Sequence, residues 1–300
     1  MKEFKEIRDD QIRIIGQEDG PRNVSRPLRI TLLVVAGIML LGALLFLLLR
    51  RHDAARETLE TPEPSYFEPV TTVPTIEMPW IGERVDSLTA GFTEIRDTTI
   101  NDIPLRIYIP HNAQMTLHVG RMNKRDTTVI FAAQAADVRA DNGGIVGAFV
   151  LRGKPLSWGL SKKGYCAVID GQVTIGVAEN SPLFEEATEK EGYFFRQYPL
   201  VDNGTLVDNV LKGKSIRRGI CDRKGEIFMI ETGTTESLHD FAQALVDLGV
   251  DQAIYLVGST AYGWAVDKQG EHHEFGDDNY YTGRRRMPPN TSYIVWRRIR

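Results

Sequence analysis

The segment from Ile30 to Leu49 constrains this chain more than any other part of it. It reads ITLLVVAGIMLLGALLFLLL and contains no charged residue and no proline. Twenty residues of α-helix cover about 30 Å, which is the thickness of the hydrocarbon core of a bilayer. A helix packed in a soluble core normally keeps a polar face, and this segment has none. We therefore predict a transmembrane helix over residues 30–49.

The flanks of the span favour an uncleaved anchor over a cleaved signal peptide. The apolar region of a signal peptide is usually about 7–15 residues long and leads to a site of small residues, whereas this span runs directly into Arg50, Arg51 and His52. The positive-inside rule gives only a slight preference for a cytoplasmic N-terminus. A short polar head before a long C-terminal part suits the same orientation. We expect a single-pass membrane protein whose residues 1–29 are cytoplasmic and whose C-terminal domain is periplasmic or extracellular.

The remainder of the chain divides into a stalk and one domain. Residues 50–79 carry five prolines among Glu, Thr and Ser, which predicts an extended stalk because proline locks φ and removes a hydrogen-bond donor. Residues 80–300 form a stretch long enough to bury its own core. The net charge is −4 with both signs interspersed, so the chain lacks the basic face that is typical of nucleic-acid binders.

Short runs rich in Val, Ile, Tyr and Phe, each bounded by turn residues, predict most of the domain to be β-strand. The clearest of these strand-like runs cover residues 105–110, 115–120, 127–134, 147–153, 165–171, 172–178, 198–204, 225–233, 252–258, 262–267 and 293–298. One amphipathic stretch from Ser237 to Gly249 predicts a helix with Ser237 as N-cap, and a second helix is expected within 180–191. The pattern indicates an α+β fold, with a mixed, largely antiparallel sheet and a few packed helices.

The sequence contains no standard catalytic or cofactor motif. There is no GxSxG, P-loop, HExxH or dinucleotide fingerprint, so no cofactor can be named and no metal site is predicted. Cys166 and Cys221 lie outside any CxxC motif and are expected either to pair or to remain two separate buried thiols. His272, His273 and Glu274 are interpreted as a polar loop.

Four polar segments are the places where chemistry is most plausible. Each also has a plain structural interpretation, as a turn, a surface arginine or a connecting loop. Their glycines would let a ligand approach the backbone, and an arginine can hold a phosphate through two parallel hydrogen bonds. The candidate residues in these segments are Asp141, Asn142, Gly143, Gly144, Asp202, Asn203, Arg217, Arg218, Ser259 and Thr260.

The order of these motifs resembles the phosphodiester glycosidase family, which includes the mannose-6-phosphate uncovering enzyme and exopolysaccharide-associated proteins. The resemblance covers roughly residues 127–270 and is best over the helix-to-strand block at 236–267. Asn142, Gly143 and Gly144 match the Asn-Gly-Gly loop of the family, although Ile145 and Val146 stand where its members have aromatic residues.

The resemblance breaks at the glycine-rich signature of the family. The signature Asp-Gly-Gly-Gly-Ser reads VGSTA over residues 257–261, so Val257 replaces the aspartate. Cleavage of a glycoside usually needs two carboxylates. Asp141 and Asp202 are the remaining candidates for acid–base work, with Asp170 and Glu231 behind them.

Three functions follow as expectations. The first is a membrane-anchored, exported hydrolase that cleaves a sugar-1-phosphodiester or an envelope polysaccharide. Asp141 or Asp202 would handle the proton, Arg217 or Arg218 would stabilise the phosphate charge, and the other candidate residues would bind the sugar or phosphate. The alternative is a non-catalytic carbohydrate- or phosphate-binding module of the cell envelope, for which Val257 argues. The third is a purely structural envelope protein.

Overall fold

The computed structural model describes residues 80–299, which belong to one compact unit. The predicted cytoplasmic head, transmembrane helix and stalk lie outside the described residues. Within 80–299, no helix is long and apolar enough to cross a bilayer. The predicted α+β fold is confirmed in its coarse form, because this part of the chain consists mostly of antiparallel sheets with two α-helices.

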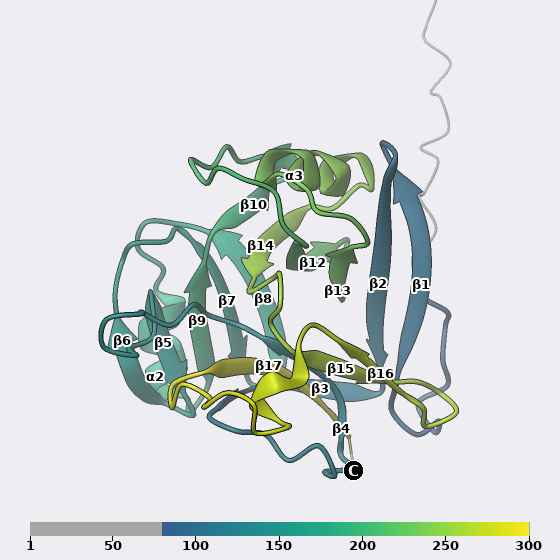
Figure 1. Cartoon of the computed structure of the whole chain (residues 1–300), viewed down its shortest axis with the longest axis horizontal. Coiled ribbons are helices and arrows are strands. Elements are labelled where there is room, and N and C mark those ends of the chain that lie inside the picture. The colour runs from purple at the N-terminus through teal and green to yellow at the C-terminus, as the bar shows by residue number, and fades with distance from the viewer. Residues whose placement is uncertain (1–79, 300) are drawn as a thin grey trace, which may run out of the picture. The chain divides into compact units, whose positions relative to one another are not determined.

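Three sheets make up the unit (Figure 1). The seven-stranded sheet has the order β1-β2-β13-β12-β14-β10-β11, with strands Phe92–Ile100, Ile103–His111, Glu226–Thr232, Arg218–Arg223, Gln252–Leu256, Pro199–Asp202 and Thr205–Leu206. The second sheet has the order β16-β15-β4-β17-β3, with strands His272–Phe275, Gly263–Val266, Val129–Gln134, Ser292–Arg298 and Ala113–Val119. The third has the order β6-β5-β9-β7-β8, with strands Lys154–Trp158, Ala148–Leu151, Tyr193–Gln197, Gly164–Ile169 and Gln172–Val177. All the pairings are antiparallel.

The helix α3 (Leu238–Asp247) covers one face of the seven-stranded sheet (Figure 1). The Ser237 side chain caps it by accepting a hydrogen bond of 3.0 Å from the Asp240 amide, as the sequence predicts. The apolar stripe of α3, which includes Phe241 and Leu245, packs in one core cluster with alternate residues of β2, β12, β13 and β14. This cluster fills the face of the sheet that α3 covers with apolar side chains. Polar groups that could form a site therefore lie on the opposite face or at the ends of the strands.

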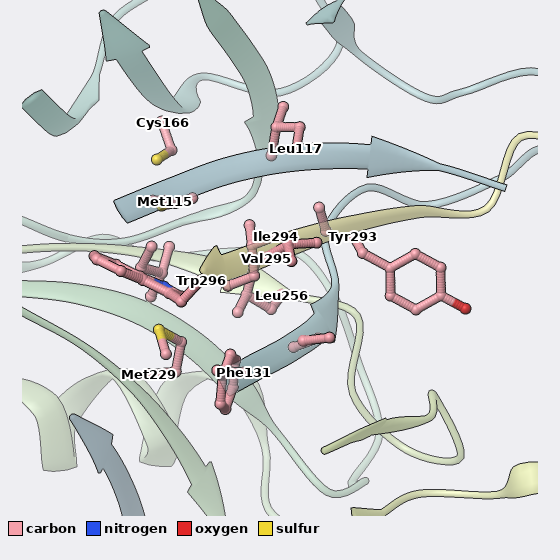
Figure 2. Close-up of a cluster of buried hydrophobic side chains, with 14 of the residues drawn as sticks. Met115, Leu117, Phe131, Cys166, Met229, Leu256, Tyr293, Ile294, Val295 and Trp296 are labelled. Carbon is pink, nitrogen blue, oxygen red and sulfur yellow. The ribbon is translucent and has the colours of Figure 1, made fainter. Parts of the chain in front are cut away.

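The opposite face of the seven-stranded sheet packs against the two five-stranded sheets. Figure 2 shows this larger core, with Ile294, Val295 and Trp296 of β17 among side chains from the neighbouring strands. Met229 and Leu256 come from the seven-stranded sheet, and all five side chains are buried. The smaller helix α2 (Leu183–Glu189) packs with the third sheet, and the 3₁₀ turn η2 (Asp278–Tyr280) precedes β17.

Most sequence-predicted elements are confirmed, and one interpretation is wrong. Every predicted strand-like run overlaps a strand, and the helix expected within 180–191 is the shorter α2. His272, His273 and Glu274 form most of strand β16, paired with β15, and not a loop. The polar loop was expected because these residues are hydrophilic; β16 is an edge strand whose first three side chains are exposed, so hydrophilic residues are tolerated there.

The two cysteines are free and buried, which confirms the second of the two expectations for them. Cys166 lies on β7 of the third sheet and Cys221 on β12 of the seven-stranded sheet. Burial raises the pKa of both thiols. They are therefore packing residues of two core clusters, and neither is an activated nucleophile.

Candidate active site

A row of alternating charges crosses four adjacent strands of the seven-stranded sheet. Asp97 on β1 faces Arg106 on β2, Arg106 faces Glu231 on β13, and Glu231 faces Arg218 on β12. Residues directly opposite one another across antiparallel strands point to the same face. We call these four residues the charged row. The order alternates acid and base, and the row contains two ion pairs, Asp97 with Arg106 and Glu231 with Arg218.

The exposed half of the charged row is the pair of Asp97 and Arg106. Arg106 Nε and Nη2 donate to the two Asp97 carboxylate oxygens at 2.7 and 3.0 Å, which is a bidentate contact. This hydrogen bonding lowers the pKa of Asp97 and raises the pKa of Arg106. Half of the Arg106 side chain is nevertheless exposed, so its guanidinium can still reach a ligand.

The buried half of the row is the pair of Glu231 and Arg218. Arg218 Nε donates to Glu231 Oε2 at 2.5 Å, and only 5% of the Arg218 side chain is exposed. The hydroxyl of Tyr108 donates to the other carboxylate oxygen of Glu231 at 3.1 Å. Burial, followed by the charge of Glu231, raises the pKa of Tyr108, so this phenol stays a donor. The Glu231 carboxylate is thus held from two sides.

Glu231 also borders a cavity of about 460 Å³. The cavity is lined by Asp97, Thr98, Thr99, Pro104, Leu105, Arg106, Glu231 and Gly233. Two carboxylates, one guanidinium and two threonines therefore surround a space that a small polar ligand can enter. Small-molecule sites typically have volumes of about 300–1,000 Å³ and a few convergent polar groups.

The loop Val257–Ala261 closes the buried end of the charged row. Arg218 Nη1 donates to the Ala261 carbonyl at 2.6 Å and to the Val257 carbonyl at 3.3 Å, and Nη2 donates to the Ser259 carbonyl at 3.4 Å. The ring of Phe275 lies 4.7 Å from the Arg218 guanidinium carbon. These contacts use the guanidinium for holding the loop, which leaves it poorly placed to bind a phosphate.

The structure brings only some of the predicted site residues together. Arg218 and Ser259 are in contact, and Thr260 follows Ser259 with its side chain exposed. Arg217 does not take part in this group. Its Nε and Nη2 atoms donate to the Glu236 and Gly213 carbonyls at 2.8 and 2.6 Å. The phosphate role expected for Arg217 or Arg218 stays a prediction that this geometry does not favour.

The Asp141–Gly144 segment is an exposed turn. Asp141 lies 3.3 Å from Arg139 Nε, and that hydrogen bond lowers the pKa of Asp141. Asn142 Oδ1 accepts from the Gly144 amide at 2.9 Å, which is the internal bonding of an Asx turn. The carbonyl of Gly143 accepts from Asn290 at 2.8 Å. The Asp141 carboxylate and the Asn142 side chain therefore have their hydrogen-bond partners within the turn.

Asp202 and Asn203 lie near the first residue of β14, whereas Arg218 lies near the last residue of that strand. They form the tight β10–β11 hairpin, where Asn203 and Gly204 both have positive φ. Asn203 contacts Gln252 at the start of β14, whereas Arg218 pairs with Leu256 at the end of the same strand. The length of β14 therefore separates this hairpin from the charged row. The catalytic role of Asp202 stays a prediction.

Sequence reasoning missed Asp97, Arg106 and Tyr108. A signal for Arg106 was present, since it is the one charged residue within the otherwise apolar strand-like run 105–110. Asp97 gave no such signal, because β1 reads FTEIRDTTI and most of its second half is polar. Glu231 was only a weaker candidate; its partner Arg218 lies on the preceding strand β12, whereas Tyr108 lies 123 residues away on β2.

A second group of polar side chains lies at the β15–β16 connection. Asp267, Glu271 and His273 bring one ligand atom each within 4.8 Å of one another. Asp267 Oδ2 lies 2.7 Å from His273 Nε2, and Asp267 Oδ1 accepts from the amides of Gln269 and Glu271 at 2.9 Å. These hydrogen bonds account for the arrangement as a turn.

No protein-family model matches this sequence, and no curated protein matches it. Among solved structures, the chain is similar to the zebrafish N-acetylglucosamine-1-phosphodiester alpha-N-acetylglucosaminidase catalytic domain auto-inhibited by its pro-peptide. The identity is 15%, the TM-score is 0.49, and the match covers 70% of this chain and 83% of that one. A hypothetical protein from Synechocystis is similar at 12% identity and a TM-score of 0.45, over 70% of this chain and 62% of that one. The chain thus spans less than two thirds of the Synechocystis protein.

Proposed function

We propose that this domain is a hydrolase-like protein of the cell envelope that acts on a sugar-1-phosphodiester at the cavity bordered by Asp97, Arg106 and Glu231. The observation that carries the proposal is Glu231, a carboxylate held by Arg218 and Tyr108 at the wall of a polar cavity. The sequence resemblance to phosphodiester glycosidases over roughly residues 127–270 supports the substrate class. The predicted membrane span and stalk support a position beside envelope glycans.

Asp97 and Glu231 are the two carboxylates at this cavity, and we propose an inverting reaction there. Asp97 and Glu231 are two strands apart, which puts their backbones about 10 Å from each other. Inverting glycosidases keep their two carboxyl groups roughly 6.5–9.5 Å apart, so that a water fits beside the sugar. Glu231 would act as the base toward that water. The exposed guanidinium of Arg106 would hold the phosphate, whose ester oxygen leaves with the phosphate group.

A sugar-1-phosphate methyl diester tests this proposal directly. The full chain is purified in detergent, and release of the free sugar is followed by the NMR signal of its anomeric proton, which also reports inversion or retention. We expect Glu231→Gln to lower kcat/KM by about 100-fold or more, as loss of a general base does, and Asp97→Asn to lower it less, because Asp97 acts only by positioning Arg106. Glu189→Gln, which alters an exposed carboxylate on α2, is the matched control and should keep full activity.

The same assay includes Asp141→Asn and Asp202→Asn, the carboxylates favoured by sequence alone. If either abolishes turnover while Glu231→Gln remains fully active, the assignment to the charged row is wrong. Melting temperatures are measured for all variants, because Glu231→Gln also removes the counter-ion of Arg218. Activity is compared only at temperatures where each variant is folded.

The second candidate is a non-catalytic carbohydrate- or phosphate-binding module. Val257, where the resembled family has aspartate, favours it, as do the inward-directed contacts of Arg217 and Arg218. On this proposal the methyl diester binds without turnover, Arg106→Met weakens binding, and Glu231→Gln leaves binding nearly unchanged. Calorimetric titration of the same diester distinguishes the two functions.

A further inference from the structure

A second cavity lies on the third sheet and is built from other elements than the charged row. Its volume is about 520 Å³. Trp158 at the end of β6 and Leu160 just beyond it form one part of its wall, and Arg196 of β9 forms another. Asn180 and Glu185, before and within α2, add polar groups. The cavity therefore combines apolar side chains with a buried cation.

Arg196 is the unusual member of this cavity. It is 2% exposed, and its Nη1 and Nη2 atoms donate to three backbone carbonyls, those of Lys162, Ala178 and Glu179, at 2.7–2.9 Å. Its Nε has no hydrogen-bond partner, and no ion pair to Arg196 occurs within residues 80–299. Burial lowers the pKa of this guanidinium. Buried charges are normally paired, since an unpaired one carries a large desolvation cost.

The missing partner of Arg196 is not supplied by the nearest candidate carboxylates. Glu185 lines the same cavity but is exposed on α2 and forms no ion pair among the described residues. Glu179 contributes its backbone carbonyl to Arg196, while its carboxylate bonds to Lys163 at 2.7 Å. A carboxylate from outside the chain would supply the missing negative charge and could accept from Nε, the guanidinium nitrogen without a partner among the described residues.

Trp158 and Leu160 indicate that the ligand also carries a surface that packs against apolar side chains. Their exposed fractions are 67% and 63%, which is unusual for two large apolar side chains that line the same cavity. The face of an aromatic ring is electron-rich and attracts the polarised C–H groups of a sugar ring. A simple apolar ligand would leave Arg196 unpaired, and a small inorganic anion would leave Trp158 uncovered. A pyranose that carries a carboxylate satisfies both.

We propose that this cavity binds an acidic sugar unit of a polysaccharide, with its ring on Trp158 and its carboxylate toward Arg196. This binding function is independent of the hydrolysis proposed above, because the two sites share no residue. It would hold the domain on an acidic envelope or matrix glycan whether or not the charged row is catalytic.

Binding of tetragalacturonate to the full chain in detergent tests the proposal, with neutral galactotetraose as the paired ligand. Calorimetric titration should show saturable binding of the acidic oligosaccharide, at least tenfold tighter than that of the neutral one and weakened by added salt. Trp158→Ala should weaken binding at least tenfold. Trp80→Ala is the matched control, because Trp80 is 54% exposed but lines a different cavity, and it should leave binding unchanged.

Two further variants examine the charge. Glu185→Gln removes a like charge from the cavity and should tighten binding of the acidic oligosaccharide about twofold, without affecting the neutral one. Arg196→Gln should abolish the preference for the acidic oligosaccharide, and its melting temperature shows whether it is folded. No binding of tetragalacturonate, equal affinity for the two oligosaccharides, or an unchanged affinity in Trp158→Ala would each overturn the proposal.

Discussion

Replacing Arg218 with methionine tests whether the buried half of the charged row holds the fold together. The Glu231 side chain is only 13% exposed and would lose its counter-ion in Arg218→Met, while the carbonyls of Val257, Ser259 and Ala261 would lose a donor. Breaking a buried ion pair from one side typically costs about 3–5 kcal/mol. A domain of this size has only about 5–15 kcal/mol in total. We therefore expect a large loss of stability.

The exposed pair of the charged row, Asp97 and Arg106, serves as the control for this stability measurement. Arg106 and Asp97 form a bidentate pair, but their side chains are 50% and 65% exposed, and an exposed pair contributes only about 0–1 kcal/mol. At roughly 2–4 °C per kcal/mol for about 200 residues, Arg218→Met should lower the melting temperature by about 6–20 °C and Arg106→Met by less than about 4 °C. Differential scanning calorimetry of residues 78–300, the compact unit, measures both.

A double variant separates the ion pair from the other contacts of Arg218. Arg218→Met with Glu231→Gln removes both charges, so its loss of stability should be smaller than the sum of the two single losses by about 2 kcal/mol. The reasoning is refuted if Arg218→Met melts within about 2 °C of the unaltered domain. It is also refuted if the two single losses simply add, because the charges would then not depend on each other.

Three further predictions concern other parts of the domain. The hydrogen bond from Thr128 is the largest influence that lowers the pKa of Asp126 to about 2 from 3.8, so this carboxylate stabilises the fold fully above pH 3.8. That stability, about 1–2 kcal/mol after solvent screening, should disappear as the pH falls from 3.8 to 2, and a pH series of melting temperatures should lose this step in Asp126→Asn. Gly258→Ala should cost about 2–4 kcal/mol in urea unfolding, because its Cβ would lie 2.2 Å from a backbone carbonyl oxygen; a loss below 1 kcal/mol would mean that the loop moves freely. Cys166 and Cys221 should react with a thiol reagent only after unfolding, since both are fully buried, and fast reaction in the folded state would contradict their placement.

Local patterns were sufficient for much of the secondary structure. The run 252–258 predicts a strand because most of its residues are β-branched, aromatic or apolar, and β14 lies there. Ser237 and Gly249 predict the ends of α3 through their capping chemistry, which involves only neighbouring residues. His272–Glu274 was misinterpreted as a loop, because the pairing of an edge strand depends on a partner, β15, that its own composition does not indicate.

The candidate site required the tertiary structure. Glu231 meets Tyr108 and Arg218 across separations of 123 and 13 residues, and which residues face one another depends on strand order and register. Asp141 and Asp202 looked equally suitable in sequence, since an Asp before Asn-Gly reads the same in a catalytic loop and in a turn.

The sequence by itself determined the coarse α+β class, and it predicts the span at 30–49, the stalk and the resemblance to phosphodiester glycosidases. These depend on composition, periodicity and motif order, which are properties of contiguous residues. Only the tertiary structure decided that Asp97, Arg106, Glu231 and Arg218 form one row and that Arg196 is buried with no ion pair to any residue of 80–299. The physical reason is that burial and charge pairing arise between strands, through hydrogen bonds that join distant parts of the chain.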